Sequence, residues 1–168
     1  MNLKEAKAKF IETWGALGSQ WGINRTMAVI HALLLTAEKP LSTEDIMEQL
    51  KVSRGNSNMN VRALINWGLV HKIVMPGERM EFFEAEKDIH KVATLILRER
   101  RRQEIEPVRR VISDLKKVND KSKSGKNFNT LMHDIDGYVK LADNVIEKAI
   151  QMDENWLTKT LKKVIIGK

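Results

Sequence analysis

Two short stretches in the first half of the chain, residues 41–50 and 54–67, carry apolar side chains at the spacing of a helix. The residues that this spacing places on a buried face are Ile46, Met47, Leu50, Val61, Leu64 and Ile65. Each stretch starts at a residue that can cap a helix N-terminus, Ser42 or Thr43 in the first and Ser53 in the second. Because so few residues separate the two helices, they must cross steeply, as in a helix-turn-helix.

The hydrophobic pattern changes period after Gly68. Residues 69–75 and 80–84 are rich in β-branched and aromatic side chains, which is typical of strands. The Pro-Gly-Glu-Arg segment at residues 76–79 is a turn signal. The sequence therefore predicts a β-hairpin, the wing of a winged helix-turn-helix.

Helical spacing returns in the rest of the chain. The further helices predicted are one with Leu3, Ala6, Phe10, Trp14 and Leu17 on one face, one from Met27 that ends before Lys39, a long one from Asp88, one from Phe128 to Ala149, and a last one from Trp156 to Ile165. Pro107 should make the long helix kink or restart, and residues 120–127 are expected to form a mobile polar linker. Gly15, Gly18 and Gly22 are expected to permit close packing and a helix end.

The expected fold is mostly α with a small β-hairpin wing. Residues 1–87 form a winged helix-turn-helix head, and residues 88–168 form a helical linker and dimerisation region. The amphipathic helices after residue 128 lack a partner within so small a head, which points to a homodimer. A symmetric dimer would also place two recognition helices about 34 Å apart, where they can read a pseudo-palindrome in duplex DNA.

The second helix of the pair begins with residues that are mediocre helix formers, including three asparagines and one arginine within residues 54–60. Asn and Arg match the edges of adenine and guanine, and a recognition helix presents mainly its N-terminal residues in the major groove. The buried stripe implies the following placement: Arg54, Asn58, Met59 and Arg62 on the outer side, Asn56 at the margin, and Ser57 and Asn60 toward the scaffold. The alternative is that this polar start is only a solvated helix cap.

Two cations of the hairpin complete the predicted DNA-binding set. Lys72 at its root and Arg79 near its tip can reach phosphate or the minor groove, unless Arg79 is simply solvated. The predicted DNA-binding residues are thus Arg54, Asn56, Asn58, Met59, Arg62, Lys72 and Arg79.

Composition agrees with a polyanionic partner. The chain has 168 residues, 42% hydrophobic content, a net charge of +7 and an isoelectric point near 9.6. It has no cysteine, which excludes disulfides and thiolate metal sites. No apolar run approaches the ~18 residues of a membrane span, so we expect a soluble cytoplasmic protein with no membrane partner.

Five short segments form a combination that resembles a known family. They are Trp-Gly-Ile-Asn-Arg at 21–25, Pro-Leu-Ser at 40–42, Ser-Arg-Gly-Asn at 53–56, Met-Asn-Val-Arg at 59–62 and Trp-Gly-Leu-Val at 67–70. Over roughly residues 10 to 85 the chain resembles the GbsR branch of the MarR-type winged-helix transcriptional regulators. The resemblance implies a homodimeric repressor or activator that answers to a small effector. Ser57 and Asn60 depart from the pattern, because many MarR-type helices are apolar at these positions.

The sequence favours neither catalysis nor a cofactor. The four histidines lie far apart, and the nearest approach to a metal site is His133 with Asp134 and Asp136, whose side chains diverge on a helix. One interpretation of Trp14, Trp21 and Trp156 is an aromatic box for a quaternary ammonium effector; tryptophans at helical spacing are more often core. Residues 98–102 carry four arginines, which we interpret as a solvated helix face supported by glutamates. The alternative function is a protein–protein interaction module with a basic helical arm.

Overall fold

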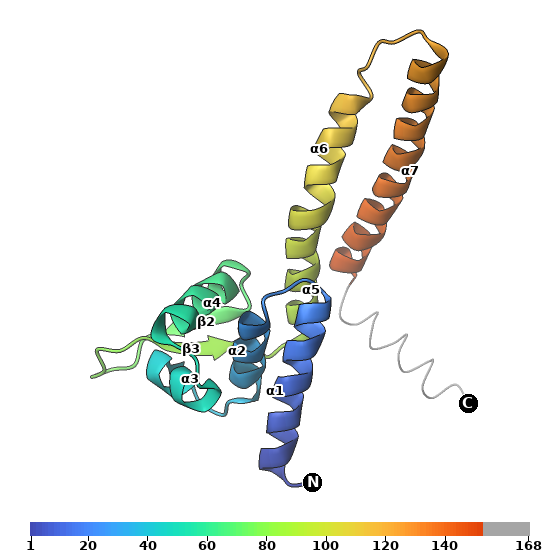
Figure 1. The fold of residues 1–168 in the computed structure, drawn as a ribbon. Coiled ribbons are helices and arrows are strands. Elements are labelled where there is room, and N and C mark those ends of the chain that lie inside the picture. The colour runs from blue at the N-terminus through green and yellow to red at the C-terminus, as the bar shows by residue number, and fades with distance from the viewer. Residues whose placement is uncertain (153–168) are drawn as a thin grey trace. The chain divides into compact units, whose positions relative to one another are not determined.

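The computed structural model describes residues 1–152, which belong to two compact units, Met1–Val92 and a second that begins at Ala93. The fold is mostly helical with one small antiparallel sheet, as the sequence predicts (Figure 1). Each unit is held together by contacts among its own residues.

The first unit begins with two helices in close contact, α1 (Leu3–Gln20) and α2 (Arg25–Thr36). Asn2 and Asn24 cap their N-termini, and Gly22, at φ +75°, permits the sharp turn between them. A Cβ on Gly15 would come within 2.4 Å of a methyl of Val29, so these backbones approach more closely than any larger residue allows. The predicted roles of the glycines in packing and at the helix end are confirmed.

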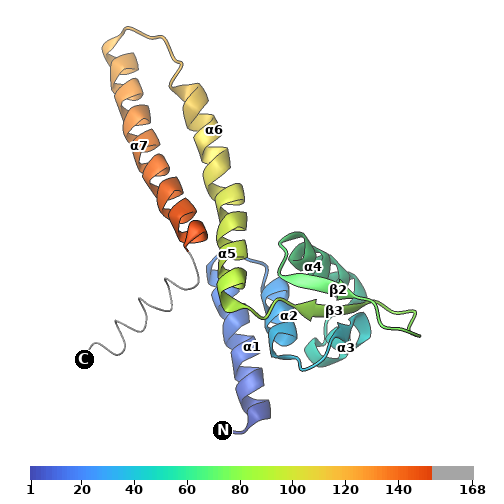
Figure 2. The ribbon, with the colours of Figure 1, turned by 180° about the vertical axis from the view of Figure 1, so that it is seen from behind.

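The next two helices, α3 (Thr43–Leu50) and α4 (Arg54–Asn66), form the predicted helix-turn-helix. Ser42 caps α3 in a capping box with Asp45, and Ser53 caps α4 by accepting the backbone N–H of Asn56. Lys51 ends α3 in the left-handed conformation, which turns the chain into the next helix. The views from both sides place α2 between α1 and the α3–α4 pair (Figures 1 and 2).

A three-stranded antiparallel sheet joins this pair, in the order β1-β3-β2. The hairpin strands are β2 (Val70–Ile73) and β3 (Phe82–Ala85), and residues 74–81 extend from their ends without pairing (Figure 2). The predicted strands at 69–75 and 80–84 are therefore too long at the tip. The strand β1 (Leu41–Ser42), which pairs with Phe82 and Phe83, was not predicted, because the extended backbone of the capping residue Ser42 also suits a strand.

The core of this unit draws its fully buried side chains from α2, α3, α4 and β2. They are Ile30, Leu34, Ile46, Val61, Leu64, Val70 and the hydroxyl-bearing Ser57. Lys87 fixes the C-terminus of α2, because its ammonium donates to the carbonyls of Leu34, Leu35 and Ala37 at 2.8–2.9 Å. These last carbonyls of a helix have no partner within the helix itself. Lys87 thus supplies donors to carbonyls at the C-terminus of α2, the helix against which α4 packs.

A continuous helical segment leads from α5 (Ile89–Arg100) into the second unit. The segment η1 (Arg101–Ile105) is π-helical, and α6 (Glu106–Leu115) follows with Pro107 in its first turn. The N–H of Glu106 donates to the carbonyl of Arg101, one residue further back than in an α-helix. The predicted restart at Pro107 thus takes the form of a π-helical turn, which accommodates the missing proline N–H.

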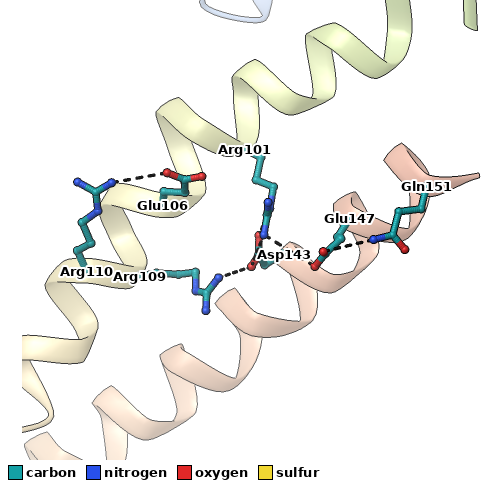
Figure 3. A network of polar contacts seen from close by, with 7 residues as sticks. All are labelled: Arg101, Glu106, Arg109, Arg110, Asp143, Glu147 and Gln151. Carbon is teal, nitrogen blue, oxygen red and sulfur yellow. Dashed lines mark hydrogen bonds and ion pairs between the residues drawn. The ribbon is translucent and has the colours of Figure 1, made fainter. Parts of the chain in front are cut away.

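The helix α7 (Lys123–Gln151) runs beside η1 and α6, and ion pairs between its aspartates and partly exposed cations join them (Figure 3). Asp143 on α7 is 4% exposed and accepts from Arg101 at 2.6 Å and from Arg109 at 2.5 Å. Those two guanidinium groups hold the pKa of Asp143 below its ordinary value. Two ammonium groups, of Lys116 and Lys140, lower the pKa of Asp136 to about 2. Polar pairs therefore fix how α7 aligns with its neighbour.

The chain between α6 and α7 is shorter than predicted. Residues 120–127 are not wholly a linker, because α7 begins at Lys123 and Ser122 caps it by accepting the N–H of Gly125. The backbone of Asp120 packs against Gly125, where a Cβ would lie 2.4 Å from the Asp120 carbonyl oxygen. The predicted helix from Phe128 to Ala149 lies within α7, and the predicted helix from Trp156 to Ile165 lies outside the described residues.

Candidate nucleic-acid interface

The polar start of α4 divides into an exposed and a buried face. Arg54, Met59 and Arg62 are exposed, with 60% of Met59 accessible to solvent. Ser57 and Asn60 are buried against the scaffold. The two remaining asparagines of the predicted set, Asn56 and Asn58, are half-buried. The projection from the hydrophobic stripe is thus confirmed for Arg54, Met59 and Arg62 outside and for Ser57 and Asn60 inside, whereas Asn58, predicted on the outer side, is half-buried.

Arg54 at the start of α4 lies against α3. Its guanidinium donates to Glu44 at 2.6 Å. The pKa of Glu44 is lowered, first by its own backbone N–H and then by the hydrogen bond from Arg54. A guanidinium carries five N–H donors, so this pair leaves most of them available at an exposed position.

Asn56 has a different environment from the other predicted contacts. Its Oδ1 accepts from Asn60 at 2.7 Å, and its Nδ2 donates to the hydroxyl of Thr26 at the start of α2 at 3.4 Å. Asn60 also donates to the Asn56 carbonyl at 2.8 Å. Both the oxygen and the nitrogen of the Asn56 amide are therefore hydrogen-bonded within the first unit. Through Thr26, this side chain links α4 to α2.

Asn58 is tied on one side only. The hydroxyl of Thr43, the first residue of α3, donates to Asn58 Oδ1 at 3.2 Å. Asn58 also lines a hollow of about 220 Å³ between α4 and the hairpin, together with Arg62 and Lys72. α4 is thus held by side chains of both neighbouring helices, Thr26 of α2 and Thr43 and Glu44 of α3.

The hairpin adds exposed cations beside α4. Lys72 on β2 forms an ion pair with Glu81, whose pKa is lowered first by the hydrogen bond from Lys72 and further by the charge of Arg62. Arg79 is exposed in the unpaired tip. The structure therefore brings Arg62 and Lys72 to one hollow. It places Arg54 at the N-terminal end of α4, beside Glu44, and Arg79 at the tip of the hairpin.

Four partners of these side chains were missed from the sequence: Thr26, Thr43, Glu44 and Glu81. Glu44, in the first turn of α3, suits the positive end of that helix's dipole and also pairs with Arg54. Each of these contacts joins residues from different parts of the fold, so the spacing of residues along a single helix or strand does not predict it.

The other chemical groups considered from sequence are accounted for by structural contacts. Asp136 is paired with two lysines, and within residues 1–152 no cluster of His, Asp or Glu could hold a metal ion. Trp14 packs on Phe10 and His31 with ring centroids 5.3 and 6.1 Å apart, whereas Trp156 lies outside the described residues.

The arginine run has glutamate partners on its own helix, as predicted. Arg100 pairs with Glu104, and Arg102 pairs with Glu99. Arg101 departs from this pattern, because it reaches Asp143 on α7. The arginines at 98–102 thus contribute to the contact between η1 and α7 as well as to a solvated helix face.

Comparisons with known proteins identify the fold. No family model matches the chain, and no curated protein matches it. Among solved structures, it superposes with a TM-score of 0.66 and 17% identity on a protein described as a transcriptional regulator, over 87% of this chain and 96% of the other. The transcriptional regulator Tm0710 from Thermotoga maritima matches with a TM-score of 0.39 and 22% identity, over 90% and 95% of the two chains. At such identities the first likeness shows a shared fold. No helix of the described part is long and apolar enough to cross a membrane.

Proposed function

We propose that this chain is a sequence-specific transcriptional regulator that binds double-stranded DNA as a homodimer. The observation that carries the proposal is the exposed polar face of α4, with Arg54, Met59 and Arg62 outermost, on a helix-turn-helix followed by a basic hairpin. The fold shared with a transcriptional regulator supports it. The resemblance of residues 10 to 85 to the GbsR branch of MarR-type regulators is part of the proposal.

The chemistry of this face divides into base readers and phosphate contacts. In the major groove Arg54 and Arg62 donate to guanine, Asn58 contacts a base edge, and Met59 offers an apolar contact. Lys72 and Arg79 contact phosphate or the adjacent minor groove. Asn56, whose amide is engaged by Thr26 and Asn60, acts in this proposal by holding α4 in place.

The homodimer is supported by apolar surface on the second unit. Among its described residues, the exposed large apolar ones are Val108, Val111, Val118, Phe128, Leu131, Tyr138, Leu141 and Val145. Leu131, Tyr138 and Val145 repeat every seven residues along α7, which is the spacing of a helix–helix seam. A stripe of exposed apolar side chains along one helix is typical of a surface that packs against a partner. In this proposal residues 1–87 are the DNA-binding head and residues 88–168 the linker and dimerisation region of a cytoplasmic protein that is not an enzyme.

Response to a small effector has one structural support in the first unit. A hollow of about 1000 Å³ lies between the first half of α1 and the end of α2, with Leu3, Ile11 and Leu33 in its mainly apolar lining. A hollow of this composition suits a small molecule with apolar surface. The effector itself has no further assignment.

The experiment that tests the proposal is selection of bound duplexes from a random pool, followed by binding assays with Arg54→Ala and Arg62→Ala. If both side chains read bases, each variant loses discrimination worth about 1–3 kcal/mol for the selected site while remaining folded. A purely electrostatic contact would weaken all sequences alike. Unchanged binding by both variants, or no enriched sequence, would overturn the proposal and favour the alternative, a protein–protein interaction module.

A further inference from the structure

Thr43 holds one end of the Asn58 side chain. Thr43 is the first residue of α3 and is 8% exposed, and its hydroxyl donates to Asn58 Oδ1 at 3.2 Å. Within the described residues, the Nδ2 of Asn58 has no hydrogen-bond partner. The two ends of this amide thus have opposite environments, because α3 engages the oxygen while the NH₂ group has no bond within the protein.

The consequence for recognition follows from the geometry of an amide. Its oxygen and nitrogen are bonded to the same carbon and point apart, so fixing the oxygen toward α3 directs the NH₂ group away from α3. An amide with a free orientation can offer either its donor or its acceptor to a base edge. An amide held at its oxygen offers mainly its donor.

We propose that Thr43 is a positioning residue that sets which base edge Asn58 reads. With its amide held in this way, Asn58 donates to a major-groove acceptor, N7 or O6 of a purine or O4 of thymine. It does not accept from N4 of cytosine or N6 of adenine. This inference rests on the proposed function, in which α4 lies in the major groove.

The neighbouring side chains of α4 make the same demand on the DNA. Arg54 and Arg62 can only donate hydrogen bonds, and Asn56 is engaged at both ends by Asn60 and Thr26. The polar side chains of α4 that face the DNA in this proposal, Arg54, Asn58 and Arg62, therefore act as donors. The operator beneath it should offer acceptors, as guanine-containing base pairs do.

The experiment compares base preferences of the full chain and three variants, Thr43→Val, Thr43→Ser and Asn58→Asp, against the duplex selected by the wild type. Thr43→Val has the shape of threonine without the hydroxyl, so discrimination at one base pair should fall about fivefold to hundredfold while the other positions keep their preferences. Thr43→Ser retains the hydroxyl and should keep the wild-type preference. Asn58→Asp can only accept, so its preference at that base pair should move to cytosine N4 or adenine N6.

Thermal unfolding of each variant is measured alongside, and Thr43→Ser provides a folded reference if Thr43→Val is destabilised. Unaltered preference in folded Thr43→Val, or an Asn58→Asp protein that still selects an acceptor, would overturn this inference and leave the proposed function standing. If the wild type enriches no sequence, the proposed function fails and this inference fails with it. A uniform loss of affinity at all positions in Thr43→Val would also overturn it, because that result indicates a structural role only.

Discussion

The Nε of Arg101 in η1 lies 2.6 Å from Oδ1 of Asp143 in α7, and Arg109 approaches the other carboxylate oxygen of the same aspartate (Figure 3). Because Asp143 is buried, replacing it with asparagine leaves both guanidinium groups facing a neutral amide. We expect Asp143→Asn to lower the free energy of unfolding by about 1–3 kcal/mol, since the arginines are partly exposed and retain some hydration. Urea denaturation of the full chain measures this change.

Asp134→Asn provides the matched control for that prediction. Asp134 is exposed on the same helix and forms no ion pair within the described residues. Its replacement should change the free energy of unfolding by no more than about 0.5 kcal/mol. Equal effects of the two substitutions would show that the ion pairs of Asp143 with Arg101 and Arg109 contribute nothing to the free energy of unfolding.

His31 should make the stability of the head depend on pH. This residue of α2 is 3% exposed and packs on Trp14, and burial lowers its pKa from 6.5 to about 4. The unfolded chain binds a proton at His31 below about pH 6.5 while the folded chain resists it, so stability is complete above that pH and falls as the pH drops toward 4. The expected loss is about 2–3 kcal/mol, measured by denaturation at several pH values.

His31→Gln cannot titrate in this range, so it should remove that part of the pH dependence. The variant is expected to be less stable than wild type at pH 7.5 and to differ from it less at pH 4.5. An identical slope for the two proteins between pH 6.5 and 4.5 would contradict the assignment to His31.

The contact between α1 and α2 depends on Gly18. A Cβ on this residue would lie 2.6 Å from the Cβ of Ala28, which cannot move without its backbone. Gly18→Ala should therefore destabilise the head by about 1–3 kcal/mol, as overpacking does. Gly55→Ala in α4 is the control, because a Cβ there meets nothing within 4 Å and should stabilise the helix by about 0.5–1 kcal/mol. Thermal unfolding that ranks the two variants in the opposite order would refute this account.

The predicted dimer can be tested on α7. Leu131 and Val145 are 53% and 58% exposed on its apolar stripe. A carboxylate at both positions should dissociate the dimer. The contacts that Asp143 and Met132 make within the second unit should stay intact, since these two residues are buried on another face of α7. We expect light scattering to show a dimer for the wild type and a monomer for Leu131→Asp with Val145→Asp.

Asn144→Asp adds a charge at an exposed polar position of the same helix and should leave the dimer unchanged. A wild-type chain that is monomeric at micromolar concentration would contradict the proposed assembly. So would a double variant that remains dimeric.

The helices and the helix-turn-helix could be predicted because their signals are local. Ser53, for example, is a residue type that favours a helix N-terminus, and it caps α4 in the structure. Val61 and Leu64 lie on the buried face of this helix at helical spacing. The strand β1 could not be predicted in this way. Leu41 pairs with Phe83 far along the chain, and a two-residue strand has no periodicity of its own.

The candidate interface could be predicted only in part for the same reason. The outward positions of Arg54, Met59 and Arg62 follow from helical geometry. The engagement of the Asn56 amide by Thr26 does not, because it depends on how α2 and α4 pack. Similarly, Asp143 reads as an ordinary polar residue until α7 lies beside Arg101.

The central claim is that the basic face of α4 and the hairpin binds duplex DNA. Fluorescence anisotropy of a labelled duplex, titrated with the wild-type chain at 50 to 300 mM salt, tests it most directly. The account predicts binding that weakens steeply with salt, with a slope in log–log form set by the number of phosphates contacted, because each contact releases counterions. Absence of binding at the lowest salt, or an affinity that does not change with salt, would contradict the claim.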